Sequence, residues 1–125
     1  MKPEIFRVYD IRGRYPNELN ERDVFDIGRV LSERLRGGKI IVGHDGRLSS
    51  PTLFGAFCKG FGMKRVLDGG LMTTPMLYYL SKTLPVVGGV MVTASHNPKE
   101  INGLKMVDRN GDAISGLEVK KWMQQ

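Results

Sequence analysis

The stretch Lys39-Ile-Ile-Val-Gly-His-Asp-Gly-Arg-Leu-Ser-Ser-Pro51 contains a strand signal, a polar loop and a helix start in direct succession. Its β-branched run over 39–43 predicts a short buried strand. Ser50-Pro51 predicts a helix start, with serine as the cap and proline at the first helical position, and this helix is expected to end near Gly62. A strand that leads through a loop into a helix is the repeating unit of α/β folds.

The residues before this stretch predict a helix over 21–36. Apolar side chains recur there at helical spacing from Val24 to Leu35. Asn20 is expected to cap the helix, and Gly37 is expected to end it. A helix therefore precedes the strand, as the alternation of an α/β fold requires.

The residues after it continue the alternation. Strands are expected over 64–68 and 86–93, and a helix between them is expected to start at Thr74-Pro75 and to end near Lys82. Gly69-Gly70 is expected to form a loop after the first of these two strands.

The last part of the chain predicts a hairpin and a further helix. The hairpin covers 103–114, with a type I′ turn at Asn110-Gly111, and the helix begins at a capping box, Ser115 to Glu118. The whole pattern predicts an α/β fold, with a mixed, mainly parallel sheet sandwiched between helices and a C-terminal hairpin.

The composition is that of one globular domain, 1–125, with a basic balance. Lys and Arg number 19 against 13 Asp and Glu, so the net charge of +6 attracts anions. The basic residues are scattered and Lys120-Lys121 is the longest run, so no nucleic-acid partner is expected. No membrane-length apolar stretch occurs and Cys58 is the only cysteine, so we expect a cytoplasmic protein with no membrane partner.

Two polar segments that come directly after predicted strands, 44–49 and 93–98, are the places to look for chemistry. Ser95 could be an exposed nucleophile, or the segment around it could be a turn that only caps the next element. A Ser-His hydrolase is a further alternative. His96 is badly placed for it, because neighbouring residues of an extended segment point to opposite sides, whereas His44 could meet Ser95 in space.

Five motifs, in one order and over nearly the whole chain, make the sequence recognisable. They are Tyr9-Asp-Ile-Arg-Gly13, Gly43-His-Asp-Gly-Arg-Leu-Ser-Ser50, Thr73-Thr-Pro-Met76, Thr93-Ala-Ser-His-Asn-Pro98 and Asn102-Gly-Leu-Lys105. With them the chain resembles the N-terminal domain of the α-D-phosphohexomutase superfamily, the phosphoglucomutase and phosphomannomutase enzymes.

The resemblance implies a reaction. Ser95 would carry a phosphoryl group and give it to a hexose monophosphate, so that hexose 1-phosphate and 6-phosphate of glucose or mannose interconvert through a bisphosphorylated sugar. Hexose 1,6-bisphosphate would serve as activator. Mg²⁺ would take one ligand from the phosphate on Ser95 and the others from an aspartate-rich loop of a second domain, which this sequence lacks.

The resemblance also implies roles for other residues. Arg12 would bind phosphate, Lys105 would neutralise charge or transfer a proton, His96 would lie beside the transferred phosphate, and Tyr9 would contact the substrate. Each of them could instead have only a structural place. The expected supports of the loop are Thr93, Asn97, Asn102, Asp45 and Arg47, with Arg47 also a possible neighbour of the phosphoserine.

Family enzymes have four domains, so we expect this chain to be the first domain of such an enzyme and to be inactive in isolation. Its expected partners are hexose phosphates and the missing C-terminal domains. The alternative is a non-catalytic phosphosugar-binding or interaction module, and a phosphatase or kinase comes third. His44 departs from the arginine common in the family, which puts a charge role there in doubt.

Overall fold

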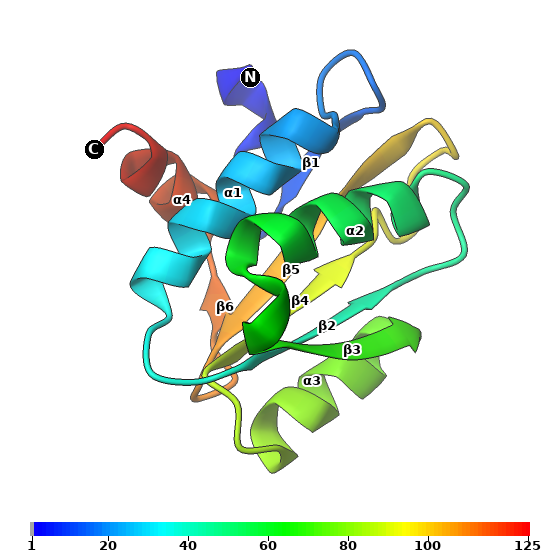
Figure 1. Ribbon diagram of the computed structural model, residues 1–125. Coiled ribbons are helices and arrows are strands. Elements are labelled where there is room, and N and C mark those ends of the chain that lie inside the picture. The colour runs from blue at the N-terminus through cyan, green and yellow to red at the C-terminus, as the bar shows by residue number, and fades with distance from the viewer. Residues whose placement is uncertain (1) are drawn as a thin grey trace.

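The computed structural model describes residues 2–125 (Figure 1). The strands in this range are β1 (Ile11–Arg14), β2 (Ile40–His44), β3 (Val66–Leu71), β4 (Gly88–Val92), β5 (Ile101–Asp108) and β6 (Ala113–Ile114). The α-helices are α1 (Glu21–Arg34), α2 (Ser50–Phe61), α3 (Thr74–Thr83) and α4 (Gly116–Met123). Short 3₁₀ turns, η1 (Pro3–Ile5) and η2 (Met63–Arg65), precede β1 and β3. None of the helices within 2–125 is both long and apolar enough to cross a membrane.

The strands form one mixed sheet in the order β1-β5-β4-β2-β3, with β6 paired to β5. The expectation of a mixed α/β fold with a C-terminal hairpin is confirmed. The expectation that parallel pairs prevail needs correction, because only β3-β2 and β2-β4 are parallel and the other pairs are antiparallel. A parallel partner on the other side of β4 from β2 would need a long crossover, whereas a short loop returns the chain from β4 directly into the antiparallel β5.

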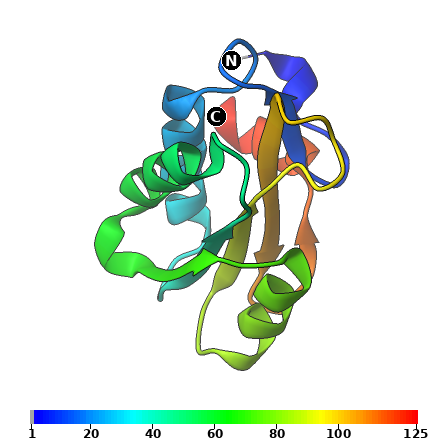
Figure 2. The same cartoon turned by 90° about the vertical axis from the view of Figure 1, so that its right-hand side faces the viewer.

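Helices cover both faces of the sheet (Figures 1 and 2). The face under α1, α2 and α4 holds the larger core, in which Val24, Phe57 and Leu104 are fully buried. The other face is covered by α3, where Ile41, Leu77, Val86 and Met91 form a smaller core. We call this second side of the sheet the α3 face.

The sequence did not predict β1, and this strand matters for the candidate site. It runs antiparallel to β5 and sets Ile11 opposite Leu104 and Arg12 opposite Gly103. An alanine Cβ at Gly103 would lie 2.0 Å from the Ile11 carbonyl oxygen and 3.0 Å from Cγ of Arg12. The absence of a side chain at Gly103 therefore permits this pairing.

Helix α1 ends two residues earlier than expected. Asn20 caps its start through a reciprocal pair of hydrogen bonds with Asp23, as the sequence indicated. At the other end, Arg65 donates to the carbonyls of Ser32, Leu35 and Gly38. Because a side chain from outside the helix satisfies these carbonyls, the chain leaves the helix at Arg34 and not at Gly37.

The caps of α2 and α3 lie one residue earlier than expected. Thr73, not Thr74, caps α3, and its hydroxyl accepts from the Met76 amide at 3.3 Å. Ser49 is the N-cap of α2 without a side-chain hydrogen bond, and Ser50 is already helical. The Ser50 hydroxyl donates instead to the Asp45 carboxylate at 2.5 Å, five residues earlier, so it does not act as a helix cap.

The hairpin turn is also different from the expected type. A type I′ turn needs positive φ at both central residues, but among residues 109–112 only Gly111 has one, at +82°. The Asp108 carboxylate accepts from the amides of Asn110 and Asp112 and closes a longer turn. At the following helix start, the Ser115 hydroxyl accepts from the Leu117 amide, not from the Glu118 amide that a capping box requires.

Candidate functional site

The two polar segments that the sequence singled out lie side by side at the carboxyl ends of β2 and β4. The Asp45 amide donates to the Val92 carbonyl at 3.1 Å, which joins the segment after β2 to the end of β4. Residues 93–98, here called the serine loop, connect β4 to β5 and stand out from the sheet (Figure 2). This is the edge of the sheet at which open α/β folds bind ligands.

Arg47 holds the backbone of the serine loop. Its Nη2 donates to the carbonyls of Ser95 at 2.7 Å and Asn97 at 2.8 Å. Its Nη1 donates to the carbonyls of Pro98 at 2.7 Å and Ile101 at 3.0 Å. The Nε donates to Asp45 at 3.3 Å, so all three nitrogens of the guanidinium are engaged. All of its N–H donors are used, as expected of a residue that supports the loop, and its place beside a phosphate on Ser95 stays a prediction.

Asp45 is the centre of the supporting hydrogen bonds. One carboxylate oxygen accepts from the Ser50 hydroxyl and the Arg47 amide, and the other accepts from the Thr93 hydroxyl at 2.7 Å and from Arg47 Nε. Burial raises the pKa of Asp45, but these hydrogen bonds and the Arg47 charge outweigh it, and the pKa lies below its usual value. Asp45 therefore stays ionised and fixes both polar segments.

The remaining expected supports are also in place. The Asn102 side chain is fully buried and donates to the hydroxyls of Ser49 at 2.8 Å and Ser50 at 2.9 Å. The Asn97 side chain donates to the Ala94 carbonyl at 2.7 Å. The Thr93 hydroxyl, which donates to Asp45, accepts from the Ser95 amide at 3.0 Å. The structure thus gathers Thr93, Asn97, Asn102, Asp45 and Arg47 in one network.

Ser95 occupies a strained backbone position at the tip of this network. Its φ is +55°, in the left-handed region that residues with a Cβ avoid. The residue is exposed, and within 2–125 its hydroxyl takes part in no hydrogen bond. Such strain persists only where the surroundings impose it, and it is commonly found at functional sites.

The histidines do not form a hydrolase arrangement with Ser95. His44 packs edge-on against Phe54 of α2 at 5.1 Å between ring centroids, and its Nδ1 lies 2.8 Å from the Asp45 carbonyl. His96 follows Ser95 on the exposed loop. No hydrogen bond joins either imidazole to the Ser95 hydroxyl in the described part of the chain. Burial raises the pKa of Cys58 to about 12, so this thiol is not a nucleophile at neutral pH.

Arg12 and Lys105 lie together on the α3 face. Arg12 is opposite Gly103, and Lys105 is two residues further along β5, so both side chains point to the same side of the sheet. The Thr93 amide donates to the Gly103 carbonyl at 2.9 Å, which sets Thr93, Gly103 and Arg12 in one row across the strands. Tyr9 lies in the turn before β1 and is 81% exposed. Thr93, the first residue of the serine loop, therefore lies two strands away from Arg12, with β5 between them.

One member of the network, Ser50, was not expected from the sequence. Its position before Pro51 predicts a helix cap, whereas it is fully buried and joins Asp45 to Asn102. The signal for this role is weak, because Ser-Pro before an apolar run is itself a good helix start. The Asp-x-Arg-x-x-Ser spacing within 45–50 is the feature that could have indicated it.

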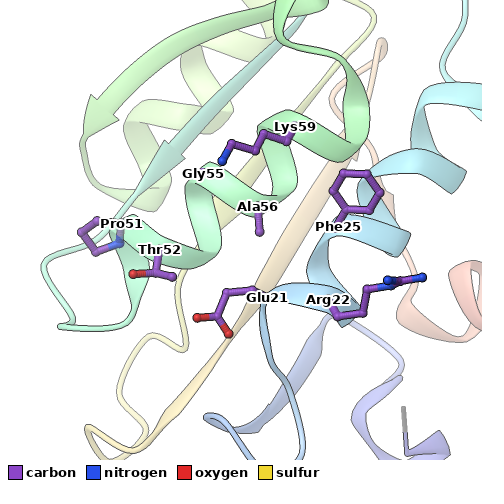
Figure 3. A pocket seen from close by; sticks show the side chains of 8 residues that line it. All are labelled: Glu21, Arg22, Phe25, Pro51, Thr52, Gly55, Ala56 and Lys59. Atoms are coloured by element: carbon purple, nitrogen blue, oxygen red, sulfur yellow. The ribbon is translucent and has the colours of Figure 1, made fainter.

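A hollow of about 580 Å³ between α1 and α2 lies apart from these residues. Its walls, shown in Figure 3, are formed by Glu21, Arg22, Phe25, Pro51, Thr52, Gly55, Ala56 and Lys59. A smaller hollow of about 230 Å³ adjoins the serine loop, between Leu48 and Ser49 on one side and Lys99 and Glu100 on the other. Of these two hollows, the smaller one neighbours the candidate site.

The residues present do not assemble a metal site by themselves. Within 2–125, no group of three or more His, Cys, Asp or Glu side chains could hold a metal ion. Asp45 is the acidic residue of the supporting network, and both of its oxygens already accept two hydrogen bonds.

The fold and the site define an α/β/α domain that presents an exposed serine, on a loop held by an arginine, at the carboxyl edge of its sheet. Residues 3–123 match the model of the family described as phosphoglucomutase/phosphomannomutase, alpha/beta/alpha domain I. The chain belongs to this family.

Individual relatives agree with this assignment. The chain is 46% identical over 112 residues to a Xanthomonas campestris protein named "Phosphohexose mutases", covering 88% of this chain and 25% of that protein. It is 47% identical over 113 residues to a phosphomannomutase of Klebsiella pneumoniae, covering 89% and 72% respectively. The crystal structure of a phosphoglucomutase/phosphomannomutase family protein from Burkholderia thailandensis superposes with a TM-score of 0.88 and 33% identity, over 99% of this chain and 30% of that one. The chain thus spans about a quarter of the Xanthomonas relative.

Proposed function

We propose that this chain is the phosphoryl-carrying part of a phosphohexomutase, and that Ser95 carries the phosphoryl group. The observation that carries this proposal is the state of Ser95: an exposed hydroxyl without a partner in residues 2–125, at φ +55°, on a loop whose carbonyls Arg47 binds. Membership of the family supports it, because the relatives are named phosphomannomutases and phosphohexose mutases.

The chemistry suits a fixed loop. Phosphoryl transfer depends on positioning and on neutralising charge, with little covalent work for the protein. A phosphoserine carries a charge of about −1.5 to −2 and needs cations near it. In our proposal Ser95 gives its phosphoryl group to a hexose monophosphate, which becomes a bisphosphate, and recovers one from the other end of the sugar. Hexose 1-phosphate and 6-phosphate, of glucose or mannose, thereby interconvert.

Arg12 and Lys105 are proposed to bind and neutralise the phosphates. Arg12 of β1 lies opposite Gly103, two positions before Lys105 on β5, so both cations are on the same side of the sheet. Tyr9 and His96 are exposed next to these elements and are proposed to contact the substrate and the transferred phosphate. The residues proposed to support the loop are Asp45, Arg47, Thr93, Asn97 and Asn102.

Mg²⁺ belongs to the proposal as a ligand of the phosphate on Ser95. The ion would neutralise negative charge on the phosphoryl group during its transfer. Because residues 2–125 offer no acidic cluster, its other ligands would be water and groups outside this sequence. We further propose that the protein works in the cytoplasm, where its buried cysteine stays reduced.

The test is the covalent state of Ser95. We expect intact-mass measurement after incubation with glucose 1,6-bisphosphate to show one added phosphate, and peptide mapping to place it on Ser95. A non-catalytic sugar-phosphate-binding module would bind the compound without any gain in mass. A phosphatase would release free phosphate continuously in the same incubation. Either result would contradict the mutase proposal.

A further inference from the structure

We infer that Asp10 is the positioning residue for Arg12, and that it sets the arginine fork so that two nitrogens remain for one phosphate. The Nε of Arg12 donates to Oδ1 of Asp10 at 3.1 Å. The Asp10 side chain is 7% exposed and that of Arg12 is 31% exposed, so the pair has a buried carboxylate end and a more accessible guanidinium end. The inference rests on the proposed function and assigns a role to a residue for which the sequence indicated none.

The N–H donors of Arg12 are divided between binding Asp10 and the proposed binding of a phosphate. The hydrogen bond to Asp10 uses Nε, and within residues 2–125 neither Nη1 nor Nη2 has a hydrogen-bond partner. A guanidinium binds phosphate best with two parallel N–H donors. Arg12 therefore differs from Arg47, whose nitrogens all bind protein groups, although both pair with an aspartate two residues earlier in the sequence.

The protein also fixes Asp10 itself. The turn before β1 is closed by a hydrogen bond from the Arg7 amide to the Asp10 carbonyl at 2.9 Å. The start of α4 packs on this turn, because the Leu117 amide donates to the Arg7 carbonyl at 3.1 Å and a Cβ at Gly116 would lie 2.2 Å from the Asp10 carbonyl oxygen. Asp10 is thus held by an element distant in sequence, as a positioning residue should be.

The other side of the pair is bounded by α3 and β5. Burial raises the pKa of Tyr78 on α3, and the negative charge of Asp10 raises it further. The stem of Arg12 crosses Gly103, where there is no side chain to displace it. The position of the guanidinium therefore depends on two features. Gly103 leaves room for the aliphatic part of the Arg12 side chain, and Asp10 accepts the hydrogen bond from Nε.

The experiment compares Asp10→Asn with a matched control, Asp26→Asn. Asp26 pairs with Nε of Arg22 at 3.4 Å on the exposed surface of α1, so its change removes the same kind of pair elsewhere. Two signals are followed in the 125-residue chain: the ¹⁵Nε–¹H resonance of Arg12 and its shift on titration with glucose 6-phosphate. We expect the resonance to be sharp in the unchanged chain and in Asp26→Asn, and exchange-broadened in Asp10→Asn.

We expect Asp10→Asn to weaken the binding of glucose 6-phosphate between about tenfold and a hundredfold, as the loss of an orienting charged hydrogen bond does. Arg12→Lys keeps the charge but cannot bind Asp10 and a phosphate through a fork, so it should lose as much affinity. If Asp10→Asn fails to fold, the affinity of Arg12→Lys for glucose 6-phosphate still tests the inference. Unchanged affinity in either variant, or no response of Arg12 to glucose 6-phosphate in the unchanged chain, would overturn the inference. Phosphorylation of Ser95 is measured separately by mass. A chain that is not phosphorylated at Ser95 would contradict the proposed function, whatever the result for Asp10.

Discussion

The Nη2 of Arg47 lies 2.7 Å from the carbonyl oxygen of Ser95, and the same side chain binds three further carbonyls between Asn97 and Ile101. Arg47 also pairs with Asp45, whose carboxylate accepts from the Thr93 hydroxyl at the base of the loop. Both ends of the serine loop are therefore attached to one ion pair. This attachment lets a serine hold a left-handed φ while its hydroxyl stays exposed.

Changing Ser95→Ala should abolish the incorporation of phosphate from glucose 1,6-bisphosphate and leave the free energy of unfolding within about 0.5 kcal/mol of the original value. The physical reason is that the hydroxyl is exposed and has no partner within residues 2–125. Intact mass and urea denaturation measure the two quantities. Ser32→Ala serves as the control and should still incorporate phosphate. Label found on Ser49, Ser50 or Thr93 would refute the assignment.

Ser95→Gly should be at least as stable as Ser95→Ala. A left-handed backbone costs a residue with a Cβ about 1–2 kcal/mol, and glycine escapes this cost while losing about 0.5–1 kcal/mol through its greater freedom in the unfolded chain. Urea denaturation of the two variants measures the difference. If the alanine variant were clearly more stable, the φ of +55° at Ser95 would not be under strain.

Arg47→Ala should lower the free energy of unfolding by about 2–4 kcal/mol, because several hydrogen bonds to a charged group are lost together and a half-buried carboxylate loses its partner. The Arg47 side chain is 12% exposed, so water replaces these contacts poorly. Arg22→Ala, at an 83% exposed side chain, is the control and should change stability by less than about 0.5 kcal/mol. Similar losses in both variants would show that Arg47 does not hold the loop.

The pKa of Asp45 predicts how stability depends on pH. Hydrogen bonds and the Arg47 charge lower this pKa in the folded protein, despite burial, below its ordinary value of 3.8. A depressed carboxyl pKa contributes stability that is complete above the unfolded pKa and is lost as pH falls through the folded pKa. Denaturation in urea between about pH 6 and pH 2 should therefore show a steeper loss below about pH 4 for the original chain than for Asp45→Asn. Equal slopes would contradict the lowered pKa.

Lys105→Ala should lower kcat/KM about tenfold to a hundredfold in a chimaera in which this chain replaces the matching quarter of the Xanthomonas relative. The change removes a cation from a site proposed to bind phosphate. Lys121→Ala, at an exposed position of α4, is the control for a general loss of charge. Turnover of glucose 1-phosphate equal to that of the unchanged chimaera would remove Lys105 from the proposed mechanism.

Local sequence determined the order of helices and strands from α1 onward, since apolar periodicity, Asn20 and the β-branched run over 39–43 act within a few residues of each other. It also marked the two polar segments that meet at one edge of the sheet, because carboxyl ends of neighbouring parallel strands share that edge. The role proposed for Ser95 rests on the family motifs.

Tertiary structure alone decided what each polar side chain binds. Ser50 has the sequence context of a helix cap, but its hydroxyl binds Asp45, five residues earlier, and Asn102, which only the folded sheet brings close. Strand β1 exists because β5 offers it an edge, and its four residues carry too little pattern to predict it. Arg12 and Arg47 each follow an aspartate by two residues, yet within residues 2–125 Nη1 and Nη2 of Arg12 have no partner, whereas those of Arg47 bind backbone carbonyls. That difference depends on which carbonyls surround each guanidinium, and these come from residues up to 54 positions away.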